Sequence, residues 1–183
     1  KKLQGGLDRL IGKINDLGMK FGIWMEPEMV SEDSELYRNH PEWAIRIPGR
    51  APMRSRYQLA LDMSNPEVIG YLHCVISKIL RENNIEYVKW DTPTLPEHRQ
   101  LELPHRYILG LYELLERLTG EFPDILFEGC CGGGGRFDAG MLYYCPQIWC
   151  SDDTDAHERT VIQYGTSFFY PISTVGSHVS AVP

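Results

Sequence analysis

The chain has 183 residues, 43% of them apolar and 23% charged, which is the balance of one soluble globular domain with a sizeable core. Its formal charge of −7 and the lack of a basic stripe argue against a nucleic-acid partner. No apolar run reaches the roughly 18 residues that a membrane span needs, so no membrane partner is expected.

The cysteines argue against both a zinc site and a disulfide framework. They are odd in number and none belongs to a CxxC pair: Cys74, Cys130, Cys131, Cys145 and Cys150. The histidines also lack ligand spacing. These features predict a reducing, cytoplasmic setting and no metal. The chain opens at Lys1 without a signal peptide, which suggests a piece of a longer protein.

The first predicted element is an amphipathic helix over residues 3–17, because apolar residues recur there at three- and four-residue steps. Gly18 ends this helix, since glycine tolerates a left-handed cap. Residues 20–24 are predicted to form a short strand. Residues 31–65 mix charges, prolines and aromatic side chains, and are expected to form a long irregular loop.

Pro66 suits the first turn of a second helix. The apolar face of that helix consists of Val68, Ile69, Leu72, Val75, Ile76, Ile79 and Leu80. Residues 83–86 break it, and residues 87–90 are the next predicted strand. A third helix is predicted from about Pro104 to Thr119, where apolar residues again recur at helical steps.

The last third of the chain continues the alternation of helices and strands. Residues 124–128 are predicted to form a strand, and the glycine-rich segment 129–140 follows it. Residues 147–150 form another predicted strand, which leads into Ser151, Asp152 and Asp153. A helix is predicted over about residues 155–164.

Helices that alternate with strands too apolar to face water indicate parallel βα units. A doubly wound sheet and a (β/α)8 barrel both fit this α/β pattern. Chemistry gathers at one face of a barrel, where successive strands end. Four strands here end on aromatic or polar side chains: Trp24 and Glu26, Lys89 and Asp91, Glu128 and Cys130, Asp152 and Asp153. We therefore predict a TIM-type (β/α)8 barrel that is incomplete in this chain, as one partial catalytic domain over residues 1–183.

Two acids at the ends of different barrel strands can face each other across the barrel mouth, which is the arrangement that glycoside hydrolysis needs. Asp91 is one candidate, because Lys89 points to the same face of an extended strand and would stabilise an ionised carboxylate. Glu26 and Glu28 form another candidate pair. A phosphate-binding loop is disfavoured, because the glycine-rich segment lacks the lysine–serine/threonine pair.

Structural explanations for the same residues stay open at this point. An acid after a strand is commonly a helix cap, and the sequence SDDTD before a helix is good capping sequence. Asp155 is the expected cap. Trp24 is more often a core residue than a sugar platform, and Arg56 is more often solvated or salt-bridged.

Six segments, in order and with family-like spacing, resemble the microbial α-galactosidases of glycoside hydrolase family 36: FGIWMEPEMV, YVKWD, FEGCCGGGGRFD, IWCSDDTDA, QYGTSFFYP and GSHVSAVP. The resemblance covers nearly the whole chain. It implies a (β/α)8 catalytic barrel that hydrolyses terminal α-1,6-linked galactose from melibiose and raffinose-type sugars. It also implies retention of configuration by double displacement, without a metal or organic cofactor.

The resemblance also implies roles for individual residues. Asp91, which ends the KWD motif, matches the nucleophile. Asp152 matches the general acid/base, and Asp153 beside it is the second candidate for that role. The remaining matches are expected to bind the sugar, together with Asp153: Trp24, Arg56, Lys89, Cys130 and Gly132. Glu26 and Glu28 have no catalytic role in this mapping.

The chain departs from the family pattern in three ways. Upstream barrel strands, one of which carries an acidic pair that grips galactose, do not precede Lys1. A methionine-asparagine-arginine run and a longer loop normally follow KWD, whereas DTPTLPEHRQ follows here, as if residues were deleted or unwritten. The large flanking β-domains are also missing. The isolated chain is therefore expected to be inactive. Its exposed sheet edges could pair with a second copy, so a homo-oligomer is one expected state.

Three other readings are kept. The chain could belong to an α-N-acetylgalactosaminidase or to a galactosyl transferase of the raffinose-synthase type, because both keep the nucleophile and the acid. It could also be a non-catalytic fragment that binds sugar through Trp24, Arg56 and Lys89.

Overall fold

The computed structural model describes residues 5–46, 49, 51–52, 54–92 and 102–177. Its centre is a five-stranded parallel sheet in the order β1-β4-β5-β6-β7. The strands are β1 Gly22–Met25, β4 Tyr87–Trp90, β5 Leu126–Gly129, β6 Gln147–Trp149 and β7 Val175–Gly176. Each strand pairs with the next parallel strand along the chain, and the order does not reverse as it does in a doubly wound sheet. This is the strand order of part of a (β/α)8 barrel, as predicted.

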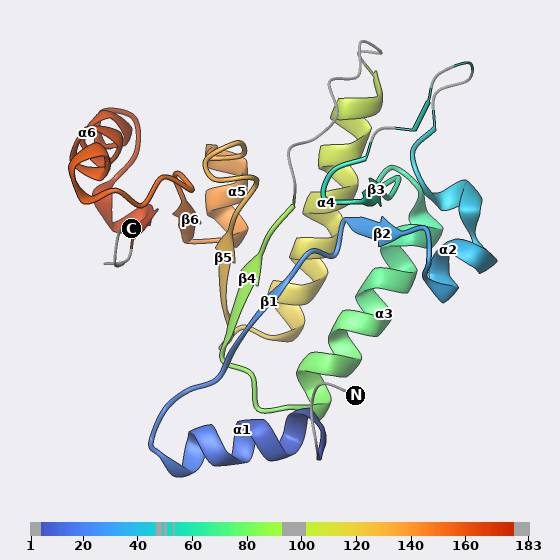
Figure 1. Ribbon diagram of the computed structural model, residues 1–183, viewed down its shortest axis with the longest axis horizontal. Coiled ribbons are helices and arrows are strands. Elements are labelled where there is room, and N and C mark those ends of the chain that lie inside the picture. The colour runs from blue at the N-terminus through green and yellow to red at the C-terminus, as the bar shows by residue number, and fades with distance from the viewer. Residues whose placement is uncertain (1–4, 47–48, 50, 53, 93–101, 178–183) are drawn as a thin grey trace.

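One helix precedes β1, and further helices lie between later strands (Figure 1). The helices are α1 Gly6–Asp16, α3 Pro66–Glu82, α4 Glu102–Glu121, α5 Ala139–Tyr144 and α6 Ala156–Ser167. The predicted start of α3 at Pro66 is confirmed, and the Asn65 side chain caps the helix by accepting from the Glu67 N–H at 2.9 Å. No helix within the described ranges is long and apolar enough to cross a membrane.

The expectation of an irregular loop over residues 31–65 is wrong in part. Strand β2 (Met29–Ser31) pairs antiparallel with β3 (Gln58–Ala60), and α2 (Glu35–Asn39) and the 3-10 helix η1 (Pro41–Trp43) lie between them. These elements are too short to show a period in the sequence. Helix α5 was also missed, since it follows directly on the glycine-rich segment and has only six residues.

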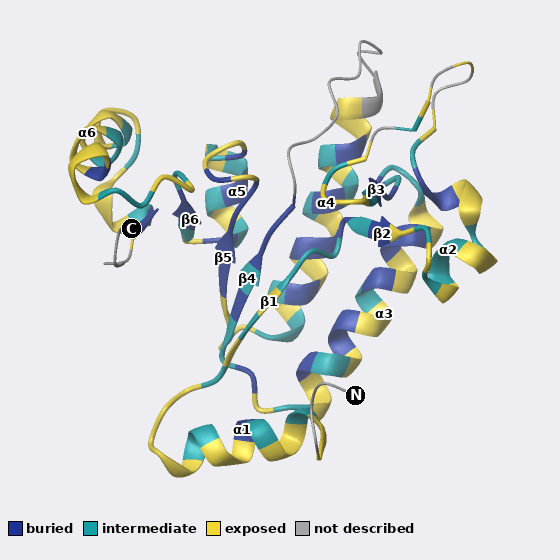
Figure 2. Cartoon of the chain, viewed as in Figure 1, coloured by how far each residue is buried: buried dark blue, intermediate teal, exposed yellow. Residues whose placement is uncertain are grey.

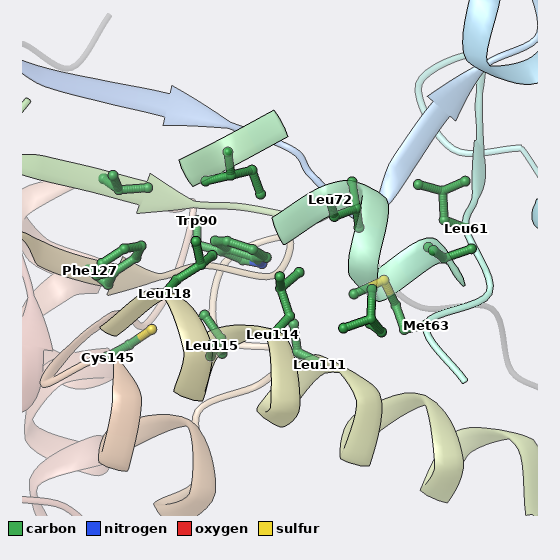
Figure 3. Packing of buried hydrophobic residues seen from close by; sticks show 14 of the residues in the cluster. Leu61, Met63, Leu72, Trp90, Leu111, Leu114, Leu115, Leu118, Phe127 and Cys145 are labelled. Atoms are coloured by element: carbon green, nitrogen blue, oxygen red, sulfur yellow. The ribbon is translucent and has the colours of Figure 1, made fainter. Parts of the chain in front are cut away.

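The hydrophobic core lies between one face of the sheet and the helices α3 and α4 (Figure 2). Val88 and Trp90 of β4 are fully buried on this face. Figure 3 shows Trp90 and Phe127 packed against leucines of α4. Burial of each such large side chain stabilises the fold by about 1.5–3 kcal/mol.

The opposite face of the sheet, here called the inner face, carries the other set of side chains. Trp24, Lys89, Glu128 and Gln147 are register partners on β1, β4, β5 and β6. Because side chains alternate along a strand, the next residues on this face stand two positions further on. Those residues are Glu26, Asp91, Cys130 and Trp149. The strand ends therefore bring the predicted site residues to one edge of the sheet.

Candidate active site

Asp91 lies directly after β4 and is only 5% exposed. Its backbone N–H donates to Met25 O at 3.0 Å, which ties the end of β4 to the end of β1. Its Oδ2 accepts a hydrogen bond from Trp24 Nε1 at 3.2 Å and lies 3.7 Å from Arg56 Nη1. The structure thus brings three predicted site residues together.

Arg56 reaches Asp91 from the tip of a tight turn. Ser55 and Gln58 exchange backbone hydrogen bonds of 3.0 and 2.9 Å, and both residues between them have positive φ, 49° for Arg56 and 63° for Tyr57. Positive φ at both central residues is the feature of a type I′ hairpin turn. Arg56 Nη1 also donates to Glu26 Oε1 at 2.6 Å, so one guanidinium serves two carboxylates.

Glu26 is a neighbour of this site that the sequence reasoning set aside. Burial raises the pKa of Glu26, the Arg56 charge lowers it, and the Asp91 charge raises it, with a net increase. Its spacing from Trp24 could have predicted its place in the site, because residues two apart on an extended strand share a face.

Lys89 lies on the inner face, as expected, but its ion pair is with Glu128 and not with Asp91. Lys89 Nζ is 3.2 Å from Glu128 Oε1, in a geometry that is not a hydrogen bond, and 4.5 Å from the centre of the Trp149 ring. Glu128 is the register partner of Lys89 on β5, which a reading along one strand does not reveal. Tyr87 donates from the other side to Glu128 Oε2.

Cys130 is buried beside Asp91. Its backbone N–H donates to Trp90 O at 2.7 Å. Burial, and after it a hydrogen bond from the thiol to Asp91, raise the pKa of Cys130 to about 12. This thiol is therefore a neutral group against the Asp91 carboxylate.

The glycine-rich segment packs between the ends of β4 and β6. Gly132 has a φ of 49°, and its N–H donates to Thr92 O at 3.0 Å. A Cβ on Gly133 would lie 3.0 Å from the backbone nitrogen of Asp152, and one on Gly134 would lie 2.4 Å from Cys150 O. The glycines are therefore needed for close packing between the loops that carry the two predicted catalytic residues.

The acidic run after β6 divides into residues with different partners. Asp152 is exposed, and its Oδ1 accepts from Trp149 Nε1 at 3.0 Å. Asp153 Oδ1 accepts from the Asp155 N–H at 3.0 Å, within a local turn. Asp155 caps α6 by accepting from the His157 and Glu158 N–H groups, as the sequence predicted. Asp152 therefore accepts its hydrogen bond from a strand residue, whereas Asp153 accepts one from its own loop.

Glu28, which the sequence left open as a paired acid, is fully buried away from the inner face. Its two carboxylate oxygens accept four hydrogen bonds: from both Arg136 Nη atoms at 2.8 Å, from Trp90 Nε1 at 2.9 Å and from Tyr107 Oη at 2.6 Å. Burial alone would lower the pKa of Arg136, but the Glu28 charge raises it. Glu28 is a structural anchor, and sequence reasoning missed its partner Arg136.

Two predictions about the site are not tested by this geometry. The shortened loop after KWD falls on residues 93–101, which lie outside the described residues. The separation of about 5–5.5 Å expected between the Asp91 and Asp152 carboxyl groups stays a prediction. Within the described ranges, no group of three His, Cys, Asp or Glu side chains could hold a metal ion.

The sequence profile of the Melibiase family matches residues 1–183. The bifunctional α-galactosidase/sucrose kinase AgaSK of Mediterraneibacter gnavus is 58% identical over all of this chain and 20% of its own length. The α-galactosidase AgaA of Geobacillus stearothermophilus is 54% identical over all of this chain and 26% of its own length.

Solved structures of both proteins share the fold. The galactosidase domain of AgaSK superposes with a TM-score of 0.94 over 100% of this chain and 26% of that one. AgaA superposes with a TM-score of 0.90 over 98% of this chain and 26% of that one. The chain thus spans between a fifth and about a quarter of these glycoside hydrolase family 36 α-galactosidases, at more than half identity. This chain belongs to the Melibiase family.

Proposed function

We propose that this chain carries the catalytic aspartates of an α-galactosidase, which removes terminal α-1,6-linked galactose with retention of configuration. The observation that carries the proposal is the buried Asp91 carboxylate, whose Oδ2 meets an indole N–H and a guanidinium. A donor and a cation on one oxygen stabilise the ionised form, which is the form that attacks carbon. Oδ1 is buried and has no nitrogen or oxygen donor among the described residues, so we assign the attack to the Asp91 carboxylate without choosing between its oxygens.

The proposed reaction has two displacements. First, a carboxylate oxygen of Asp91 bonds to the anomeric carbon as the bond to the leaving oxygen breaks, and Asp152 gives its proton to that oxygen. Second, Asp152 takes a proton from water, and the water oxygen displaces Asp91 from the same carbon. Each displacement inverts the carbon, so the product has the configuration of the substrate.

Crystallised variants of one relative support the pair Asp91 and Asp152. AgaA variants with one aspartate replaced were crystallised with stachyose and with raffinose, and the two replaced aspartates are 70 positions apart. Asp152 follows Asp91 by 61 positions. The alignment with AgaA spans 192 residues against the 183 of this chain, so the relative carries nine additional residues. The separation of the two aspartates is thus nine positions longer in AgaA than here, which equals the number of additional residues in the alignment.

In this proposal the sugar contacts Trp24, Arg56, Lys89, Cys130, Gly132 and Asp153. The substrates are raffinose-type galactosides, including melibiose, by analogy with the AgaA complexes. The chain is one part of a barrel domain, in a cytoplasmic protein that uses no cofactor. Five parallel strands of the eight in such a barrel are present in the described residues. We therefore expect turnover only when the remaining strands complete the mouth.

A chimera tests the proposal. The galactosidase domain of AgaSK would receive this chain in place of its matching segment, since the two align over 183 residues without a difference in length. The chimera is expected to hydrolyse p-nitrophenyl α-galactoside and raffinose, and the isolated chain is the comparison that lacks the other strands. Asp91→Gly should lower kcat by at least about 10³-fold. Asp152→Gly should lower kcat on raffinose by about 10²–10⁴-fold.

Azide assigns the two roles separately. In Asp91→Gly, azide can attack the bound α-galactoside directly, and one inversion gives the β-galactosyl azide. In Asp152→Gly, azide attacks the galactosyl-enzyme, and two inversions give the α-galactosyl azide. Exchanged stereochemistry would contradict the assignment. Faster hydrolysis of the α-N-acetylgalactosaminide than of the galactoside would contradict the proposed substrate.

A further inference from the structure

The indole of Trp149 is the side chain that holds the proposed acid/base. Trp149 is the last residue of β6 and is 5% exposed. Its Nε1 donates to Asp152 Oδ1 at 3.0 Å, from three residues earlier in the chain. The exposed Asp152 thus has one oxygen tied to a buried group of the sheet. The other carboxylate oxygen, Oδ2, takes no part in this bond.

Two cations fix the Trp149 ring in turn. Lys89 Nζ lies 4.5 Å and the Arg159 guanidinium carbon 4.4 Å from the ring centre, both within the range of cation–π attraction. Arg159 comes from α6 and is buried. It donates to Ser151 O at 3.0 Å and to Gly176 O at 3.2 Å. Lys89 therefore holds the ring from β4, the strand that leads to Asp91. Arg159 of α6 holds the loop that carries Asp152 through its hydrogen bond to Ser151 O.

We infer that Trp149 is a positioning residue for the acid/base, and that it assigns the transferable proton of Asp152 to Oδ2. The inference rests on the proposed function. It goes further in naming the group that orients Asp152 and the oxygen that does the chemistry. It also gives Lys89 a second task, which is to support the Trp149 ring.

The assignment follows from the chemistry of the indole. An indole nitrogen can only donate, so Oδ1 must accept whether Asp152 is protonated or ionised. A proton on Oδ1 would compete with the indole N–H for the same oxygen. Oδ2 therefore carries the proton to the leaving oxygen in the first displacement, and Oδ2 takes the proton of water in the second.

The test separates substrates by leaving group. A sugar leaving group needs the proton, whereas p-nitrophenolate departs without one. In the chimera described above, Trp149→Phe keeps a ring for Lys89 and Arg159 and removes the N–H. We expect kcat on raffinose to fall about 10- to 150-fold, the range that one hydrogen bond to a charged group is worth. The rate of p-nitrophenolate release in the first turnover, before Asp152 has to activate water, should fall less than about 3-fold.

Trp43→Phe is the matched control, because Trp43 is equally buried but lies in η1. It should leave the ratio of the two rates unchanged. An equal loss on both substrates in Trp149→Phe, or no loss on raffinose, would overturn the inference while the proposed function stands. A folded parent chimera without any turnover would overturn the proposed function, and this positioning role with it.

A second replacement guards against a misfolded variant. β-(3-Benzothienyl)alanine at position 149 has the shape of tryptophan with sulfur in place of the N–H. The same selective loss on raffinose is expected from it. Full activity on raffinose with this side chain would show that the N–H does not position Asp152.

Discussion

At the scale of single residues, the turn at Arg56 and Tyr57 combines strain with function. Both residues have positive φ, although neither is glycine or asparagine. A left-handed residue with a Cβ costs about 1–2 kcal/mol. Asparagine adopts this conformation more readily than tyrosine. The strained conformation places the Arg56 guanidinium next to the carboxylates of Asp91 and Glu26.

Replacement of Tyr57 should therefore stabilise the chain. Tyr57 is 92% exposed, so Tyr57→Asn loses little packing and should raise the free energy of unfolding by about 0.5–1 kcal/mol. Urea unfolding measures the change. Tyr143→Asn is the control, because Tyr143 is exposed on the helix α5 and its φ is negative. Stabilisation of equal size in both variants would mean that the turn is not strained.

The thiols offer a second test at the residue scale. Burial raises the pKa of Cys145 to about 12, and burial with the Asp91 hydrogen bond does the same for Cys130. Because the thiolate is the reactive form, iodoacetamide at pH 8 should alkylate both about 10³-fold more slowly than the exposed Cys74. Peptide mass spectrometry on the native chain gives the three rates.

The variant Asp91→Asn isolates the contact between Cys130 and Asp91. Removal of the negative charge should speed alkylation of Cys130 and leave Cys145 unchanged, since Asp91 does not influence the pKa of Cys145. Equal changes at both cysteines would instead indicate a general loosening of the core.

At the scale of elements, Glu28 joins segments that are distant in the chain. It lies between β1 and β2, Trp90 ends β4, Tyr107 is in α4, and Arg136 belongs to the glycine-rich segment. A buried charge pair is stabilised by hydrogen bonds to its polar atoms, and here the carboxylate accepts four of them, whereas Arg136 Nε has no partner among the described residues. The network includes Trp90, the residue before Asp91, and through Arg136 it holds the glycine-rich segment against the sheet.

Tyr107 gives this network a pH dependence. Burial and then the Glu28 charge raise the pKa of Tyr107 well above its usual 10.0. A raised pKa means that the stability from the neutral phenol is complete below pH 10 and is lost as the pH rises above it. Tyr107→Phe should cost about 1.5–3 kcal/mol at pH 8, from the lost hydrogen bond to a charged group.

The free energy of unfolding of the parent chain should exceed that of Tyr107→Phe by about 1.4 kcal/mol less at pH 11 than at pH 8. The reason is that only the parent has to keep a phenol neutral in the folded state while the unfolded chain ionises it. Urea unfolding at both pH values measures this difference. Leu111→Ala, in the same helix and without a titratable group, should show a constant difference. A constant difference for Tyr107→Phe as well would contradict the raised pKa.

Elements with a strong local signal were predictable from the sequence. Pro66 and the apolar period gave the start of α3, and YVKW gave both ends of β4. Strands β2 and β3 have three residues each, too few for a period, and α2 and η1 separate them along the chain. Contacts across the sheet were also out of reach. The pairing of Lys89 with Glu128 depends on register, which one strand does not encode.

At the scale of the whole molecule, strand order decides the architecture. Parallel strands that follow one another in chain order, with α3 and α4 on one face, place every strand end at the same edge (Figure 1). This is why residues as far apart as Trp24, Asp91 and Asp152 could be assigned to one site from the sequence. The buried arginines could not, because Arg136 and Arg159 act through long-range contacts with carboxylates, carbonyls and a ring.

The central claim is that Asp91 forms a covalent bond to galactose, and trapping that bond tests it most directly. In the Asp152→Gly chimera, p-nitrophenolate leaves unaided but water lacks its base, so the galactosyl-enzyme should accumulate. Acid quenching, digestion and mass spectrometry should find one galactosyl residue on the peptide that contains Asp91. A galactosyl residue on another peptide, or a burst of p-nitrophenolate without any adduct, would contradict the account.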